Sequence, residues 1–140
     1  MGKFDEFEVG QKHKFEVTVT KDKVEEFMRV TGDRNPIHHD KIFASDTRFG
    51  RPVCHGMLLA SFFSTIVGMY LPGEGALYLT QELNFRKPVF VGDTVEVSGE
   101  IIKKQDAQRI LTLKMSVKKD EILVVDGKAM VMTEIENSNT

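Results

Sequence analysis

Apolar and polar side chains alternate along much of this chain, and the alternation predicts an antiparallel sheet. The first run covers residues 13–20 and places Phe15, Val17 and Val19 on one face, as in a half-buried strand. Later in the chain the same period predicts further strands over residues 76–85, 91–103, 109–117 and 122–134. Asp126-Gly127 could form a hairpin turn or a bulge, and we favour a bulge within one long strand.

Two helices of different character are predicted before residue 75. Thr20 can cap a helix whose apolar face includes Val24 and Met28, and Gly32 is suited to ending it in the left-handed conformation. Residues 55–70, HGMLLASFFSTIVGMY, are apolar on every side of a helical wheel, so the sheet should wrap around this second helix. We therefore predict one α+β domain over residues 1–140, in which an antiparallel sheet curls around a buried helix.

Composition and charge exclude several classes of partner. The formal net charge is only −2, which gives no basic surface for nucleic acid or for an anionic membrane. The uncharged apolar stretch over residues 57–70 is shorter than the roughly 20 residues that a membrane-spanning helix needs. The first residues contain no apolar run typical of a signal peptide, and Cys54 is the single cysteine, so we expect a cytoplasmic protein.

Side chains that can move protons gather in the segment TGDRNPIHHD. Pro36 stiffens this turn, so that Asp33, Asn35 and His38 could place an acid, an amide and an imidazole around one small molecule. Asp and Asn before a proline are also ordinary turn residues, and His38 could equally be an exposed or already satisfied side chain. The adjacent residues HHD are too close in sequence for a persuasive metal site, so we expect no metal.

A second candidate group lies at the start of the apolar helix. His55-Gly56 stands where a helix offers free N–H groups and the positive end of its dipole, which suits an oxyanion. Without a side chain, Gly56 could let a carbonyl approach its N–H, or it could merely allow close helix packing. Ser64, two turns further along, could point toward the same end of the helix. Serines in apolar helices usually bond a preceding carbonyl, however, and Ser61 competes for any role.

Three segments, FMRVTGDRNPIHHDKIFA, FGRPVCHGMLLASFFS and LPGEGALYLTQELNFRKPVFVGDTVEV, resemble the MaoC-like R-specific enoyl-CoA hydratases, also called hydratase 2. The resemblance covers roughly residues 5 to 135, and the D-x-N-P-x-H core is its specific element. It implies a hotdog fold and a homodimer with sites near the subunit interface. It further implies that Asp33 and His38 hold the hydrating water, that Asn35 and Ser64 help to position water or substrate, and that the Gly56 N–H contacts the thioester oxygen.

The activity implied by this resemblance is reversible hydration of trans-2-enoyl-CoA to (R)-3-hydroxyacyl-CoA. We expect no cofactor, because Asp33, His38 and the Gly56 N–H already supply a base, an acid and an oxyanion donor. The alternatives are a 3-hydroxyacyl dehydratase acting on acyl carrier protein, a hotdog thioesterase, and a non-catalytic subunit that binds acyl thioesters. Four cations could meet coenzyme A phosphates or an acidic carrier protein, or could be plain solvated surface: Arg48, Arg51, Arg86 and Lys87.

Overall fold

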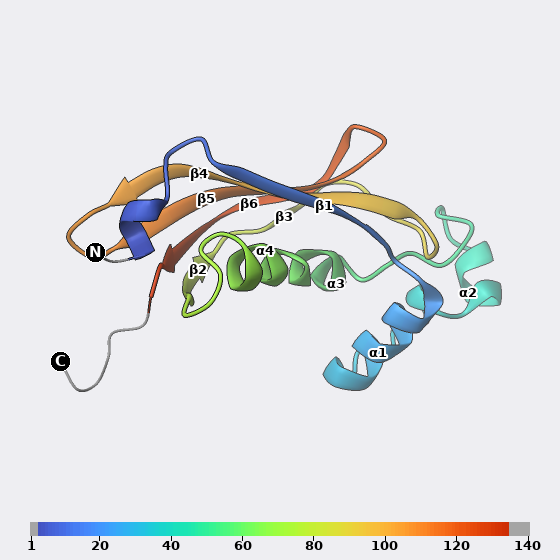
Figure 1. Cartoon of the computed structure of the whole chain (residues 1–140). Helices are drawn as coiled ribbons and strands as arrows, with labels where there is room; N and C mark the ends of the chain where they lie inside the picture. The colour runs from blue at the N-terminus through green and yellow to red at the C-terminus, as the bar shows by residue number, and fades with distance from the viewer. Residues whose placement is uncertain (1–2, 135–140) are drawn as a thin grey trace.

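A curved antiparallel sheet packed against a helical segment forms the body of the protein, as the computed structural model of residues 3–134 shows (Figure 1). The strands are β1 (Lys12–Thr18), β2 (Leu77–Gln81), β3 (Asn84–Phe85), β4 (Thr94–Gln105), β5 (Ile110–Lys119) and β6 (Ile122–Met132). Their order in the sheet is β1-β4-β5-β6-β2, and β3 also pairs with β6. Every pairing is antiparallel, so the predicted α+β class with an antiparallel sheet is confirmed.

Side-chain alternation in the long strands places the core on one face of the sheet. In β5 the buried residues Leu111, Leu113, Met115 and Val117 alternate with residues that are exposed or half-buried. The same alternation buries Val95 and Val97 in β4. One predicted strand is wrong in its extent, because residues 76–85 form two separate strands, β2 and β3, against β6.

β6 is one long strand with a bulge, as predicted, but the bulge lies at Val124. Val117 pairs with Val125 and Lys118 with Leu123, which leaves Val124 as the extra residue, whereas Asp126 and Gly127 pair regularly with β5. Gly127 is needed for close packing and not for a bulge. A Cβ atom at this position would lie 1.8 Å from the backbone oxygen of Glu82, so only glycine admits this close approach.

The apolar helix is present but is covered on one side only. It consists of α3 (Gly56–Ser61) and α4 (Phe63–Met69), which follow the concave side of the sheet (Figure 1). Phe63 and Ile66 are fully buried, whereas the side chains of Met57 and Met69 are 56% and 68% exposed. The predicted sheet curled around an apolar helix is therefore confirmed in this form: the curved, open sheet covers one helix face, and the opposite face is exposed in the described part of the single chain.

The first helix, α1 (Lys21–Thr31), begins and ends where the sequence predicts. The Thr20 side chain accepts a hydrogen bond from the Lys23 N–H, and Gly32 adopts a φ of 81° and donates to the Met28 carbonyl. Three shorter helical elements lie near the N-terminus and after α1: η1 (Lys3–Glu6) before β1, and η2 (Pro36–His38) and α2 (Lys41–Ser45) after α1. None of the helices within residues 3–134 is long and apolar enough to cross a membrane.

The close approach at Gly127 gives a stability prediction. Gly127→Ala should lower the free energy of unfolding by about 1–3 kcal/mol, since the added methyl group must push β6 away from the Glu82 carbonyl. Lys128→Ala is the matched control, because the Lys128 side chain is exposed on the same strand and should change stability by less than about 0.5 kcal/mol. Denaturant unfolding of both variants measures the difference, and equal stabilities would contradict the packing argument.

Candidate active site

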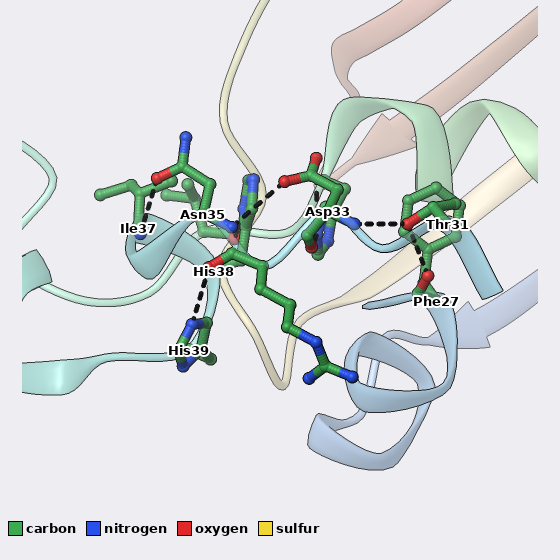
Figure 2. Close-up of polar contacts among 10 residues, drawn as sticks. Phe27, Thr31, Asp33, Asn35, Ile37, His38 and His39 are labelled. Atoms are coloured by element: carbon green, nitrogen blue, oxygen red, sulfur yellow. Dashed lines mark hydrogen bonds and ion pairs between the residues drawn. The ribbon is translucent and has the colours of Figure 1, made fainter. Parts of the chain in front are cut away.

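A relay of side-chain hydrogen bonds shapes the loop that follows α1 (Figure 2). The Thr31 hydroxyl donates to the Phe27 carbonyl at 2.8 Å and accepts from the Asp33 N–H at 3.1 Å. Asp33 Oδ1 then accepts from the Asn35 N–H at 3.2 Å, and Asn35 Oδ1 accepts from the Ile37 N–H at 3.3 Å. Each step is a local turn that Thr, Asp and Asn favour, so the sequence itself sets the course of the loop. The second carboxylate oxygen of Asp33, Oδ2, is the one that faces the candidate site.

His38 is held by a backbone carbonyl that also fixes its tautomer. Its Nδ1 lies 2.7 Å from the Val53 carbonyl oxygen, which can only accept, so Nδ1 carries the proton and donates. The Val53 N–H donates in turn to the Ile37 carbonyl at 3.1 Å, which holds residues 37–38 beside residue 53. In the neutral ring the Nε2 of His38 therefore keeps its lone pair and can accept a proton.

His55 brings Asp33 and His38 together. Its ring is only 2% exposed and stacks on the His38 ring, with centroids 3.7 Å apart and planes inclined by 24°. Its Nε2 lies 3.1 Å from the Asp33 carbonyl oxygen and 3.9 Å from Asp33 Oδ2. Burial lowers the pKa of His55 despite the opposing contact with the Asp33 backbone, so the ring is neutral at physiological pH.

Three titratable side chains lie close together at the candidate site. One ligand atom from each of Asp33, His38 and His55 lies within 4.8 Å of the others, a spacing that a divalent cation could also bridge. Nδ1 of His38 and Nε2 of His55 donate to backbone carbonyls, so in the neutral rings the lone pairs lie on Nε2 of His38 and on Nδ1 of His55.

Gly56 lines a cavity of about 480 Å³ at the start of α3. Three of the four predicted cations line the same cavity: Arg48, Arg86 and Lys87. Arg51 does not, because its guanidinium lies over the Phe90 ring, 4.1 Å from the centroid. The Phe85 ring packs so closely on Gly56 that a Cβ there would lie 2.7 Å from the ring, and so glycine also serves packing at this position.

His38 faces a second cavity, of about 760 Å³, which Val24, Met28 and Arg51 also line. Within residues 3–134, then, the predicted oxyanion donor and the predicted base open onto different cavities.

Ser64 lies on the exposed face of α4, and neither lining includes it. Asn35 is exposed, and its side-chain oxygen is committed to capping η2, which leaves its amide nitrogen for any contact with substrate.

Cys54 precedes His55 and also lines the cavity of Gly56, but its thiol is not a nucleophile. Burial, together with the nearby Asp93 carboxylate, raises the pKa of Cys54 to about 12. The thiolate is the reactive form of cysteine, and very little of it exists near neutral pH at such a pKa. The site therefore offers acid and base groups without a covalent catalyst at this position.

Sequence reasoning missed His55 as a member of the site. The sequence places it at the helix start, and the structure then buries its side chain between the two proton-handling groups. The available signal was a histidine directly before an apolar helix, at an N-cap position where Ser, Thr, Asp and Asn are preferred.

Comparison with known proteins places this site in a family. A family model described as MaoC like domain matches residues 5–123. An (R)-specific enoyl-CoA hydratase of Aeromonas caviae is 42% identical over 125 residues, 89% of this chain and 93% of the relative. A 3-hydroxybutyryl-CoA dehydratase of Methylorubrum extorquens is 39% identical over 128 residues, 91% of this chain and 82% of the relative.

The fold agrees with a solved structure of the same kind. R-hydratase PhaJ1 from Pseudomonas aeruginosa in the unliganded form superimposes with a TM-score of 0.90 at 35% identity, over 95% of this chain and 86% of that chain. The expected hotdog fold and the resemblance drawn from the D-x-N-P-x-H core are thus confirmed. This chain belongs to the MaoC-like domain family.

Proposed function

We propose that this protein is an R-specific enoyl-CoA hydratase, which adds water reversibly to trans-2-enoyl-CoA to give (R)-3-hydroxyacyl-CoA. The observation that carries the proposal is the convergence of the Asp33 carboxylate and the His38 imidazole around His55. Relatives that are 39% and 42% identical bear the names of a hydroxyacyl-CoA dehydratase and an enoyl-CoA hydratase, which are two directions of one reaction.

In the proposed reaction a water molecule is held between Asp33 Oδ2 and His38 Nε2. The lone pair on His38 Nε2 takes a proton from the water as its oxygen bonds to C3 of the substrate. The proton that His38 has taken from the water then passes to Asp33, which delivers it to C2, so both side chains return to their starting state and the sum is the addition of one water. Exchange of these two roles is the alternative. The Gly56 N–H donates to the thioester oxygen, a contact worth roughly 3 kcal/mol in the transition state by analogy with other oxyanion donors.

We further propose that the active form is a homodimer. Four large apolar side chains are exposed on the helix face and on edge strand β2: Met57, Met69, Leu77 and Leu79. An exposed strand edge with apolar neighbours favours pairing with a second copy. Such a copy would also cover Ser64 and could join the two cavities that His38 and Gly56 line separately.

The cations at the Gly56 cavity support a substrate that carries phosphate. Arg48, Arg86 and Lys87 can neutralise the phosphates of coenzyme A while the thioester reaches Gly56. The same cations would suit an acidic acyl carrier protein, and comparison of kcat/KM on the two thioesters separates these carriers.

The free, buried Cys54 is compatible with a reducing compartment, and we propose the cytoplasm.

Incubation with crotonyl-CoA tests the proposed function directly. The enoyl absorbance should fall without release of free thiol, and an R-specific 3-hydroxyacyl-CoA dehydrogenase should oxidise the product. Thiol release would identify a thioesterase, and no change at all would indicate a non-catalytic subunit. Oxidation by only an S-specific dehydrogenase would overturn the stereochemical assignment.

Chelation tests the proposed absence of a metal requirement. Treatment with EDTA should leave the hydration rate unchanged, because Asp33, His38 and the Gly56 N–H supply the base, the acid and the oxyanion donor. Inhibition that an added divalent metal reverses would contradict this mechanism.

Substitution of the two proton-handling residues should abolish most activity. Asp33→Asn and His38→Ala should each lower kcat by a factor of about 100 or more without loss of the fold. The double variant should lose much less than the product of the two factors, because both groups act on the same water. Asp46→Asn and His13→Ala are matched controls away from the site that should keep activity. Full activity of either site variant, or strictly multiplicative losses, would contradict the shared-water mechanism.

Sedimentation at micromolar concentration should give the mass of a homodimer. Leu79→Lys should weaken the dimer and lower activity with it, because it places a charge on the exposed edge strand β2. Val30→Lys is the matched control, since Val30 is 86% exposed on α1, away from that edge, and should leave the dimer intact. A monomeric wild-type protein with full activity would refute the proposal.

A further inference from the structure

We infer that His55 is a positioning residue for hydration, which holds the Asp33 carboxylate and the His38 imidazole in the arrangement that the reaction needs. This inference rests on the proposed function and adds a residue to it. His55 lies with its ring between the two groups, in contact with both, and is buried where they are partly or largely exposed. Three contacts support this role: a hydrogen bond that His55 donates, a stack with the His38 ring and a contact with the Phe27 ring.

The first contact fixes Asp33. The Asp33 carbonyl can only accept, so the 3.1 Å contact requires a proton on His55 Nε2. The His55 Nε2 atom also lies 3.9 Å from Asp33 Oδ2, near the carboxylate but beyond hydrogen-bond distance; Oδ1 is the oxygen that accepts from the Asn35 N–H. His55 thus joins the start of α3 to the loop after α1, two segments separated by 22 residues in the sequence.

The second contact fixes the plane of the base. His38 is anchored at Nδ1 by the Val53 carbonyl, but one hydrogen bond leaves the ring free to tilt about it. The His55 ring lies against the His38 ring face, 3.7 Å between centroids, and restricts that tilt. Two different contacts therefore set the direction of the His38 Nε2 lone pair. One is the hydrogen bond at Nδ1, and the other is the ring stack with His55.

The third contact makes His55 itself rigid. The Phe27 ring lies 4.8 Å from the His55 ring centroid at a 57° tilt, and the Phe27 carbonyl accepts from Thr31 in the loop relay. A ring packed between Phe27 and His38 cannot change its χ angles without displacing one of them. Phe27 thus connects the loop relay to the stacked rings, because its carbonyl accepts from Thr31 and its ring contacts His55.

A purely structural role for His55 does not explain why the position carries a histidine. His55 is the N-cap residue of α3, yet its side chain makes no capping hydrogen bond. Its Nδ1 is buried and has no hydrogen-bond partner among the described residues. An unpaired buried polar atom lowers stability, so an apolar residue would stabilise this position better if packing were the only requirement. A neutral histidine is the side chain that combines an aromatic face with an N–H in the ring plane.

Two substitutions separate the two functional contacts. His55→Phe keeps the stacked ring and removes the donor, whereas His55→Gln keeps an amide donor near Nε2 and removes the ring. Each should lower kcat about 10-fold or more with KM changed less than about twofold, since misplacement of reacting groups mainly affects the chemical step. His13 stacks on Tyr70 with centroids 3.5 Å apart, so His13→Phe and His13→Gln make the same changes to a stacked histidine elsewhere and should keep kcat.

Two further measurements exclude a merely structural role. In a His38→Ala background, His55→Gln should cost little additional activity, because no imidazole remains to be oriented. Nitrogen-15 NMR of the wild-type histidine rings should find His55 neutral with its proton on Nε2, which needs no activity measurement. The groups that bear on its charge are Asp33, His38 and His39.

The outcomes are distinct for the inference and for the proposed function. Loss of kcat in both His55 variants, with normal thermal unfolding and a non-additive double variant, supports positioning. Full kcat in both variants, a loss explained entirely by unfolding, an additive double variant, or a proton on Nδ1 would each overturn it. A wild-type protein that fails to hydrate crotonyl-CoA would instead refute the proposed function, while the tautomer measurement would still test the His55 contacts.

Discussion

Packing of the α3–α4 segment against the concave face of the sheet fixes the position of the helix start, beside which the loop with Asp33 and His38 lies. Ile66 and Phe63 are fully buried there, and Gly99 in β4 leaves space for Ile66, since a Cβ would lie 2.7 Å from the Ile66 side chain. The start of this segment carries His55 and Gly56. Because a packed helix cannot slide along the sheet without opening cavities, its first residues have one position relative to the strands.

Backbone carbonyls decide the chemical state of the two histidines beside Asp33. The Val53 carbonyl puts the proton of neutral His38 on Nδ1, and the Asp33 carbonyl puts the proton of His55 on Nε2. The neutral His38 ring thereby keeps a lone pair on Nε2, and the His55 ring becomes a neutral donor. Burial lowers the pKa of His55, which keeps a second positive charge away from the His38 ring as it takes a proton.

The outer face of the helix exposes apolar side chains in the single chain, and this surface is the basis of the proposed dimer. Sheet and helix together bury a continuous core, but the outer helix face with Met57 and Met69 and the edge strand β2 with Leu77 are left uncovered. The same side carries Ser64, and the Gly56 cavity begins at the same helix. The proposed second copy on this side would bury this apolar surface.

The sequence by itself determined the features that depend on neighbouring residues. Strand alternation, the helix stop at Gly32 and the turn that carries Asp33 and His38 all follow from interactions within a few positions of the chain. Only the tertiary structure decided the bulge at Val124, the division of residues 76–85 into two strands and the one-sided cover of the helix, because these depend on pairing and packing between distant segments. His55 belongs to this second group, since its partners become its neighbours only when α3 packs beside the loop after α1.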